Sequence, residues 1–153
     1  MKWLFAVAAV FGSACAGEIA PGDLVLRIDA RDEELLEAAR QAAAEWARCG
    51  GDRRVLVSTV DGVPLRRVDP RDPILHRNNA RVHFLDARDL ARPAWIVVRG
   101  DRPELLRPLV AHEVGHVLLR TLEHSGEGSI MAGRPARPSD TVTELDCAML
   151  RRR

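Results

Sequence analysis

Residues 112–116 read His-Glu-Val-Gly-His, and they follow an apolar run at residues 105–110. On a helix, His112 and His116 are four residues apart and share one face, which is the separation that two imidazoles need to hold one zinc ion. Glu113 lies beside them, where it can take a proton from a water molecule that the metal activates. This stretch therefore predicts a metal-binding helix with a general base next to two ligands.

The third metal ligand is left open by the spacing of the nearby residues. His124 comes eight residues after His116, which is about 12 Å along a straight helix. This is too far to share one ion, so if His124 is the third ligand, the helix must end between these two histidines and residues 120–123 must turn the chain back toward the metal. Glu144 and Asp146 are the alternatives, because either carboxylate would complete a site of two histidines and one acidic ligand from a later helix.

The chain before this helix contains several segments with the composition of strands. Strands are expected at residues 24–28, 55–60, 63–68, 81–85 and 94–99. Asp61-Gly62 predicts a tight hairpin turn between the second and the third of them. Trp95, in the last segment, is expected to pack in the core, or else residues 94–99 form an edge strand on which an extended peptide aligns.

Three helices are expected around these strands. Asp32 can cap a long first helix whose apolar stripe ends near a Cys-Gly-Gly sequence. Pro108 is tolerated only in the first turn of a helix, so the metal-binding helix is expected to begin near residue 107. Thr141 and Glu144 form a predicted capping box at the start of the last helix.

The overall composition is that of one globular domain. Charged residues make up 29% and hydrophobic residues 46% of the 153-residue chain, which is ordinary for a soluble fold. Lys and Arg together number 23 against 22 Asp and Glu, so no basic excess points to nucleic acid as a partner. We expect a single domain over residues 17–153 that acts as a monomer.

Residues 1–16 have the pattern of a signal peptide. A positive n-region precedes an apolar h-region at residues 3–11, which is too short to span a bilayer as a helix. Ala14-Cys15-Ala16 fits ordinary cleavage, whereas residues 12–15 resemble a bacterial lipobox that would leave a lipidated Cys15 at the N-terminus. Both interpretations place the protein outside the cytoplasm: secreted, periplasmic or at the cell surface, with a lipid anchor in the second case.

Export changes how the cysteines are interpreted. If Cys15 is removed or lipidated, Cys49 and Cys147 are the two that remain. Two cysteines in an oxidising compartment suggest one disulfide, which requires their Cα atoms to approach within about 7 Å. Two free buried thiols are the alternative.

The run from His112 to Leu118, followed by Glu123-His124-Ser125 and Gly128-Ser129-Ile130-Met131, resembles the metzincin zinc proteases and most of all their matrixin-like branch. The resemblance implies a small α+β domain with a twisted, mostly parallel sheet, an active-site helix, a backing helix and a C-terminal helix. It also implies a set of site residues: His112, His116 and His124 as zinc ligands, Glu113 as catalytic base, and Met131 in a Met-turn beneath the metal. A plain core position is the alternative for Met131.

Two positions depart from the family pattern. The family places a Gly three residues and the third His six residues after the second His, where this chain has Leu119 and Leu122. We interpret Arg120-Thr121, or a neighbouring pair, as an insertion, which would put a residue other than Gly at positive φ in the turn. Some metzincins carry a Tyr ligand two residues after the Met. Here that position is Gly133, and the chain contains no Tyr, which favours the matrixin-like branch.

These observations predict an exported zinc endopeptidase that hydrolyses an extended peptide or protein substrate, with residues 132–139 shaping the specificity pocket. One alternative is a zinc peptidase of another class, in which Glu144 replaces His124 as the third ligand. The other is an inactive metzincin-like protein that binds peptides or zinc without turnover.

Overall fold

The computed structural model describes residues 19–133 and 139–152. The expected signal peptide, Cys15 and most of the predicted specificity segment lie outside the described residues. The elements run in the order β1 (Leu24–Arg27), α1 (Glu33–Ala47), β2 (Val55–Ser58), β3 (Val63–Val68), η1 (Pro73–Leu75), β4 (Ala80–Phe84), β5 (Pro93–Arg99), η2 (Pro103–Leu105), α2 (Leu106–Leu118) and α3 (Glu144–Arg151). Within the described ranges, no helix has the length and apolar character needed to cross a membrane.

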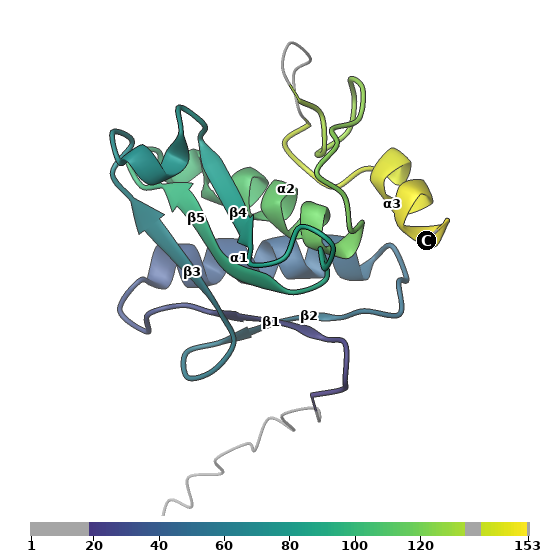
Figure 1. Cartoon of the computed structure of the whole chain (residues 1–153), viewed down its shortest axis with the longest axis horizontal. Coiled ribbons are helices and arrows are strands. Elements are labelled where there is room, and N and C mark those ends of the chain that lie inside the picture. The colour runs from purple at the N-terminus through teal and green to yellow at the C-terminus, as the bar shows by residue number, and fades with distance from the viewer. Residues whose placement is uncertain (1–18, 134–138, 153) are drawn as a thin grey trace, which may run out of the picture.

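The strands form one five-stranded sheet in the order β2-β1-β3-β5-β4. Neighbouring strands are parallel except for β4 and β5, which are antiparallel. Helices α1 and α2 pack on each other and bury a shared core against one face of the sheet, while α3 lies close to the C-terminus (Figure 1). The predicted α+β class with a mostly parallel sheet and three α-helices is confirmed at this level.

The hairpin predicted at Asp61-Gly62 is wrong. β1 lies between β2 and β3 and runs parallel to both, so the loop between β2 and β3 carries the chain across β1 instead of folding it back. Gly62 has φ +121°, and a Cβ atom there would lie 2.4 Å from the Val25 carbonyl oxygen. This crossing therefore needs glycine. Asp61-Gly62 correctly predicts a bend between β2 and β3, but β1, which precedes both strands in the chain, lies between them in the sheet.

The segment at residues 94–99 is also not the edge strand that one interpretation required, because β5 lies between β3 and β4 and the edge is β4. Ile96 and Val98 belong to the core beneath the helices, so Trp95 lies on the other face of the sheet. There its ring stacks on that of His83, with centroids 4.7 Å apart. Trp95 is half-buried and is not part of the main core, so the predicted core packing is also wrong.

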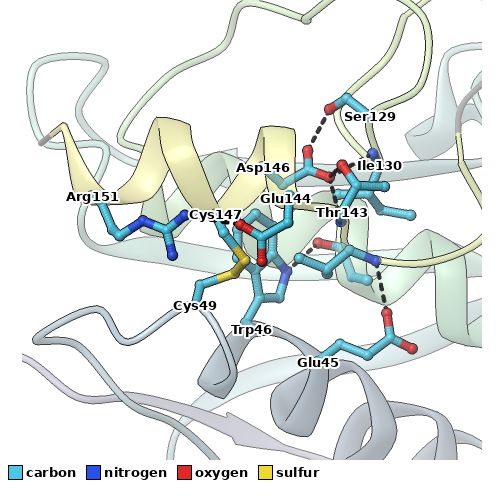
Figure 2. The surroundings of a disulfide bond; sticks show 12 residues. Glu45, Trp46, Cys49, Ser129, Ile130, Thr143, Glu144, Asp146, Cys147 and Arg151 are labelled. Atoms are coloured by element: carbon cyan, nitrogen blue, oxygen red, sulfur yellow. Dashed lines mark hydrogen bonds and ion pairs between the residues drawn. A yellow bond between two sulfur atoms is a disulfide. The ribbon is translucent and has the colours of Figure 1, made fainter.

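Helix α1 forms as its sequence predicts. The Asp32 side chain accepts a hydrogen bond from the Leu35 backbone N–H at 3.1 Å and caps the helix. One face of the helix is buried against α2 and the sheet, and it ends with Trp46 only 2% exposed. Beyond the helix, Cys49 lies at disulfide distance from Cys147 of α3, with Cα atoms 4.7 Å apart, as predicted (Figure 2).

The cap of α3 lies two residues later than predicted. Thr143 is the N-cap, and Asp146 closes the capping box by accepting from the Thr143 backbone N–H. Thr141-Glu144 and Thr143-Asp146 both fit the capping pattern, so spacing alone does not choose between them. Asp146 is 0% exposed and also accepts from Ser129, and this tertiary contact selects the second pair. The predicted box of Thr141 and Glu144 is therefore wrong.

Candidate metal centre

Helix α2 presents one face to the core and another to a cleft. Val110, Val114 and Val117 are 0% exposed and fix the inner face by ordinary apolar packing. His112 and His116 line a cleft of about 620 Å³ on the other side. The Trp46 indole N–H of α1 donates to the carbonyl oxygen just before His112, at Ala111, over 2.8 Å. This bond fixes where α2 sits along α1, and so where the two histidines point.

The helix ends where the sequence requires. Its last residue is Leu118, and the next turn is a Schellman motif in which the Thr121 N–H donates to the His116 carbonyl oxygen at 3.1 Å. Glycine usually occupies the left-handed position of this motif, but here Arg120 does so with φ +46°. The expected residue other than Gly at positive φ is therefore found at one of the two positions interpreted as an insertion.

The turn brings His124 back to the helix. Ligand nitrogens of His112, His116 and His124 all lie within 4.8 Å of one another, and these residues could hold a metal ion. Their ring centroids are 4.9 to 5.2 Å apart. His116 is buried, His112 is half-buried and His124 is exposed. The helix thus supplies the inner part of the cluster, and the turn supplies its solvent side.

Backbone carbonyls fix the orientation of the two helical histidines. The Nδ1 of His112 lies 2.7 Å from the Ile130 carbonyl oxygen, and the Nδ1 of His116 lies 2.8 Å from that of Thr121. Because a carbonyl oxygen can only accept, Nδ1 carries the proton in both rings, which leaves the Nε2 lone pairs free for a metal. Desolvation lowers the pKa of His112, and it lowers that of His116 to about 4 with help from its histidine neighbours. Both rings are therefore neutral near pH 7, as a ligand must be.

Glu113 is buried between α2 and the edge strand β4, with 6% of its surface exposed. Burial raises its pKa to about 8, while the Val82 backbone and the positive charge of Arg81 act in the opposite sense. A carboxyl group with a raised pKa is a good proton acceptor once a nearby cation favours its charged form.

The Ser-Ile-Met segment forms a buried turn against the helix. Met131 is 1% exposed, and its sulfur would lie 2.2 Å from a Cβ atom built on Gly115. A larger residue at Gly115, between His112 and His116, would therefore displace Met131 and Trp46. Met131 thus packs directly against the part of α2 that carries His112 and His116, where the Met-turn interpretation expects it. Its role there remains a prediction.

The roles of two residues at the site are not those that the sequence predicted. Asp146 was considered as a ligand, but it lies outside the histidine cluster and accepts hydrogen bonds from Ser129 Oγ and the Ile130 N–H (Figure 2). Gly133 was seen only as the position of an absent Tyr. A Cβ atom there would lie 2.6 Å from the His124 ring, so the third histidine needs a glycine beneath it.

Glu144 does not take part in this arrangement. Its side chain is 87% exposed and pairs with Arg151 at 2.9 Å. Within the described ranges, the histidine triad is the one group of metal-ligand residues close enough to share an ion. The geometry therefore disfavours the alternative in which Glu144 replaces His124.

The cleft extends from the triad along the edge of the sheet. Its lining comes from the Ala80–Val82 part of β4, from Leu105 of η2 and from α2 between Pro108 and His116. Ser139 and Asp140 close the cleft near the turn that holds Met131. No family model matches the chain, and no curated protein matches it. The functional argument therefore depends on this geometry and on the sequence pattern.

Proposed function

We propose that this protein is a zinc-dependent endopeptidase of the metzincin type, closest to the matrixin-like branch. The observation that carries the proposal is the convergence of His112, His116 and His124 beside the buried carboxyl group of Glu113. A histidine triad with an adjacent Glu is the ligand and base set of zinc hydrolases that activate water.

The donor set suits zinc. Three imidazole nitrogens leave one position of a tetrahedral ion open, which is the composition of a catalytic rather than a structural zinc site. The bonds of His112 and His116 to backbone carbonyls are the outer partners that orient such ligands. When bound, zinc would supply Lewis-acid chemistry, polarising a peptide carbonyl and making water acidic near neutral pH.

Glu113 is the proposed general base and acid. It faces the cleft beside the triad, where its carboxylate can take the proton of the attacking water and then give it to the leaving amine. Its burial excludes competing solvent and raises its pKa toward the operating pH. A pKa near the operating pH favours proton transfer both to and from the carboxylate of Glu113.

The edge strand suggests the form of the substrate. β4 is paired with β5 on one side only, and its residues Ala80–Val82 border the cleft. An extended peptide could therefore pair with the free edge of β4 and lie across the triad. This arrangement favours a peptide or protein substrate, bound through its main chain and cleaved internally.

Export is part of the same proposal. The signal-peptide pattern of residues 1–16 and the Cys49–Cys147 pair are both typical of proteins that mature in an oxidising compartment. We propose that the protein acts as a monomer, secreted, in the periplasm or at the cell surface. Mass spectrometry of the mature N-terminus distinguishes ordinary cleavage from a lipid anchor on Cys15.

A binding protein without turnover is the second candidate. It is favoured by the altered turn before His124, where Arg120 takes the left-handed conformation (φ +46°) that glycine usually occupies. The two candidates share the metal site and the cleft, so only a measurement of hydrolysis separates them.

The test is cleavage of a mixed peptide library by zinc-loaded wild type and by zinc-loaded Glu113→Gln. We expect wild type to cleave internal bonds and the variant to keep its zinc but lose about a thousandfold in kcat, a typical cost of removing a general base. Zinc-loaded wild type that cleaves no peptide would contradict the endopeptidase proposal and favour the protein without turnover. Equal rates for the two proteins would remove Glu113 from the mechanism.

A further inference from the structure

Helix α3 depends on a covalent anchor. It has 8 residues, fewer than an isolated helix needs to be stable in water, and it packs only lightly on the other helices and strands. Met149 and Leu150 are partly buried, but the disulfide from Cys147 to Cys49 is its one covalent tie to the end of α1 (Figure 2). The position of α3 is therefore set to a large extent by that bond.

Asp146, which precedes Cys147 of the disulfide, forms hydrogen bonds with the turn beside the proposed metal centre. Asp146 accepts from Ser129 Oγ and, at 3.1 Å, from the Ile130 N–H, and it also accepts from Thr143 Oγ1 at 2.6 Å. Ser129 Oγ in turn accepts from the Met131 N–H at 2.9 Å. One buried carboxylate thus holds the backbone of the turn on which Met131 lies.

That turn carries the acceptor for a proposed metal ligand. The Ile130 carbonyl oxygen binds the Nδ1–H of His112 at 2.7 Å. The Ile130 N–H and carbonyl are therefore both engaged, one by Asp146 and the other by His112. A displacement of α3 would move Asp146, shift this turn and loosen the orientation of His112.

The same end of α1 also forms a hydrogen bond to α2 at the residue just before His112. Trp46 donates to the Ala111 carbonyl oxygen, and Glu45 Oε2 accepts from the Val142 N–H at 2.9 Å. Figure 2 shows Glu45, Trp46 and Cys49 coming from one helix end and facing the segments around Asp146. The disulfide therefore closes a ring that runs from α1 through α3 and the turn to His112 and back through α2.

We propose that the Cys49–Cys147 disulfide is a positioning element of the metal centre and raises its affinity for zinc by acting through Asp146. The proposal rests on the proposed binding of zinc by the histidine triad. In an oxidising compartment, it means that disulfide formation and metal retention are coupled. Loss of outer partners of a ligand typically costs 10- to 100-fold in metal affinity, so an effect of about tenfold is expected here.

The first experiment measures the zinc Kd by competition with a chromophoric chelator, without thiol reductants because they bind zinc. Wild type is compared with Cys49→Ala/Cys147→Ala, at a temperature where circular dichroism shows both folded. We expect the Kd of the variant to rise about tenfold. Arg67→Met is the matched control, because Arg67 pairs with Asp32 and Glu34 at the opposite end of α1. It should cost stability and leave the Kd unchanged.

A cycle with Asp146→Asn tests the route of the effect. If the disulfide acts through Asp146, this substitution raises the Kd strongly when the disulfide is present and little when both cysteines are Ala. If instead the increases in Kd caused by Asp146→Asn and by removal of the disulfide multiply in full, the two act by independent routes and the proposal is overturned. A folded Cys49→Ala/Cys147→Ala protein whose Kd stays within twofold of wild type would also overturn it.

Asp146→Asn with the disulfide intact keeps the proposal testable if the cysteine variant does not fold. Its zinc Kd should rise about tenfold, because the substitution loosens the turn whose Ile130 carbonyl oxygen orients His112. A Kd within twofold of wild type would overturn the proposal. Wild type that binds no zinc would instead overturn the proposed function, and this proposal with it.

Discussion

Two turns place the histidine triad, and they are built in opposite ways. The turn at residues 129–132 is buried throughout, with exposed fractions between 0% and 3%, and a buried carboxylate holds its backbone. The turn at residues 120–123 is largely exposed, and it contains a strained Arg120 with φ +46°. Its bonds are local, between Thr121 and His116 and between the Glu123 N–H and Thr121 Oγ1.

The difference shows how rigidity is distributed around the proposed site. The buried turn orients His112 through the Ile130 carbonyl oxygen, and several polar contacts that water does not reach hold the turn itself, so each contact counts strongly. The exposed turn carries His124 on the solvent side, where its backbone hydrogen bonds compete with water. Removing contacts of the buried turn should therefore be costly, whereas changes in the exposed turn should cost little or even stabilise.

The largest effect is expected from removing the disulfide that anchors the buried side. Cys49 and Cys147 are 98 residues apart in sequence, and a cross-link that closes a loop of that size restricts the unfolded chain strongly. The free energy of unfolding of Cys49→Ala/Cys147→Ala should fall by about 4 kcal/mol. Urea denaturation against wild type measures it, and a loss below about 1 kcal/mol would show that the cross-link is not a main anchor.

Asp146→Ala should have the next largest effect. It leaves the N–H groups of Ile130 and Thr143 and the Ser129 hydroxyl without their acceptor, and unpaired buried groups cost about 1–3 kcal/mol each before relaxation. We expect a loss of about 3 kcal/mol in urea denaturation. Asp146→Asn, which keeps the shape, should lose less, and an equal loss would mean that packing rather than hydrogen bonding matters.

The same carboxylate gives the buried turn a pH dependence. Burial acts to raise the pKa of Asp146, but the hydrogen bonds from Ser129 and Thr143 outweigh it and hold the pKa below its ordinary value of 3.8. Its stabilisation is therefore fully present above about pH 4 and is lost as the pH falls through the lowered pKa. Acid denaturation of wild type should be steeper below pH 4 than that of Asp146→Asn, and identical slopes would contradict the assignment.

Arg120→Gly should act in the opposite direction on the exposed turn. Glycine relieves the left-handed backbone of Arg120 but costs more entropy on folding, so a net gain of about 0.5–1 kcal/mol is expected. Arg120→Ala is the matched control, since it also removes the repulsion between Arg120 and Arg53 while keeping the strain. Thermal unfolding that ranks Ala at or above Gly would show that charge, not backbone conformation, governs this turn.

The smallest effect is expected for Glu144→Gln. Glu144 starts the same helix as Asp146, but its side chain is 87% exposed and pairs with Arg151. Exposed ion pairs contribute about 0–1 kcal/mol, so the urea midpoint should barely move and zinc content should stay as in wild type. Loss of zinc would revive Glu144 as the third ligand.

Local patterns predicted most of what lies within one element. The position of Pro108 predicted the start of α2 to within one residue, and the distance from His116 to His124 required the helix to end between these two histidines if both are ligands. Asp32 as a cap and the pairing of Cys49 with Cys147 also follow from the sequence. The inferences about α2 and Asp32 depend on residues close together in the sequence. The disulfide follows because only two cysteines remain once Cys15 is removed or lipidated.

What the sequence did not reveal depends on contacts between distant segments. The strand that separates β2 from β3 comes before both, so Asp61-Gly62 had the local signature of a hairpin. The competition between Glu144 and Asp146 for the cap is decided by Ser129, which belongs to another part of the chain. The glycine beneath His124 is recognisable only once the ring is placed above it. These features need the tertiary structure.

The most direct test of the metal centre is the zinc content of protein purified without chelator, measured by atomic emission for wild type and His124→Ala. Both turns must place their histidines for a three-ligand site, so we predict one zinc per wild-type chain. His124→Ala should lose most of it, because two imidazoles alone hold zinc weakly. Wild type without stoichiometric zinc, or a His124→Ala variant that retains it, would contradict the proposed metal centre.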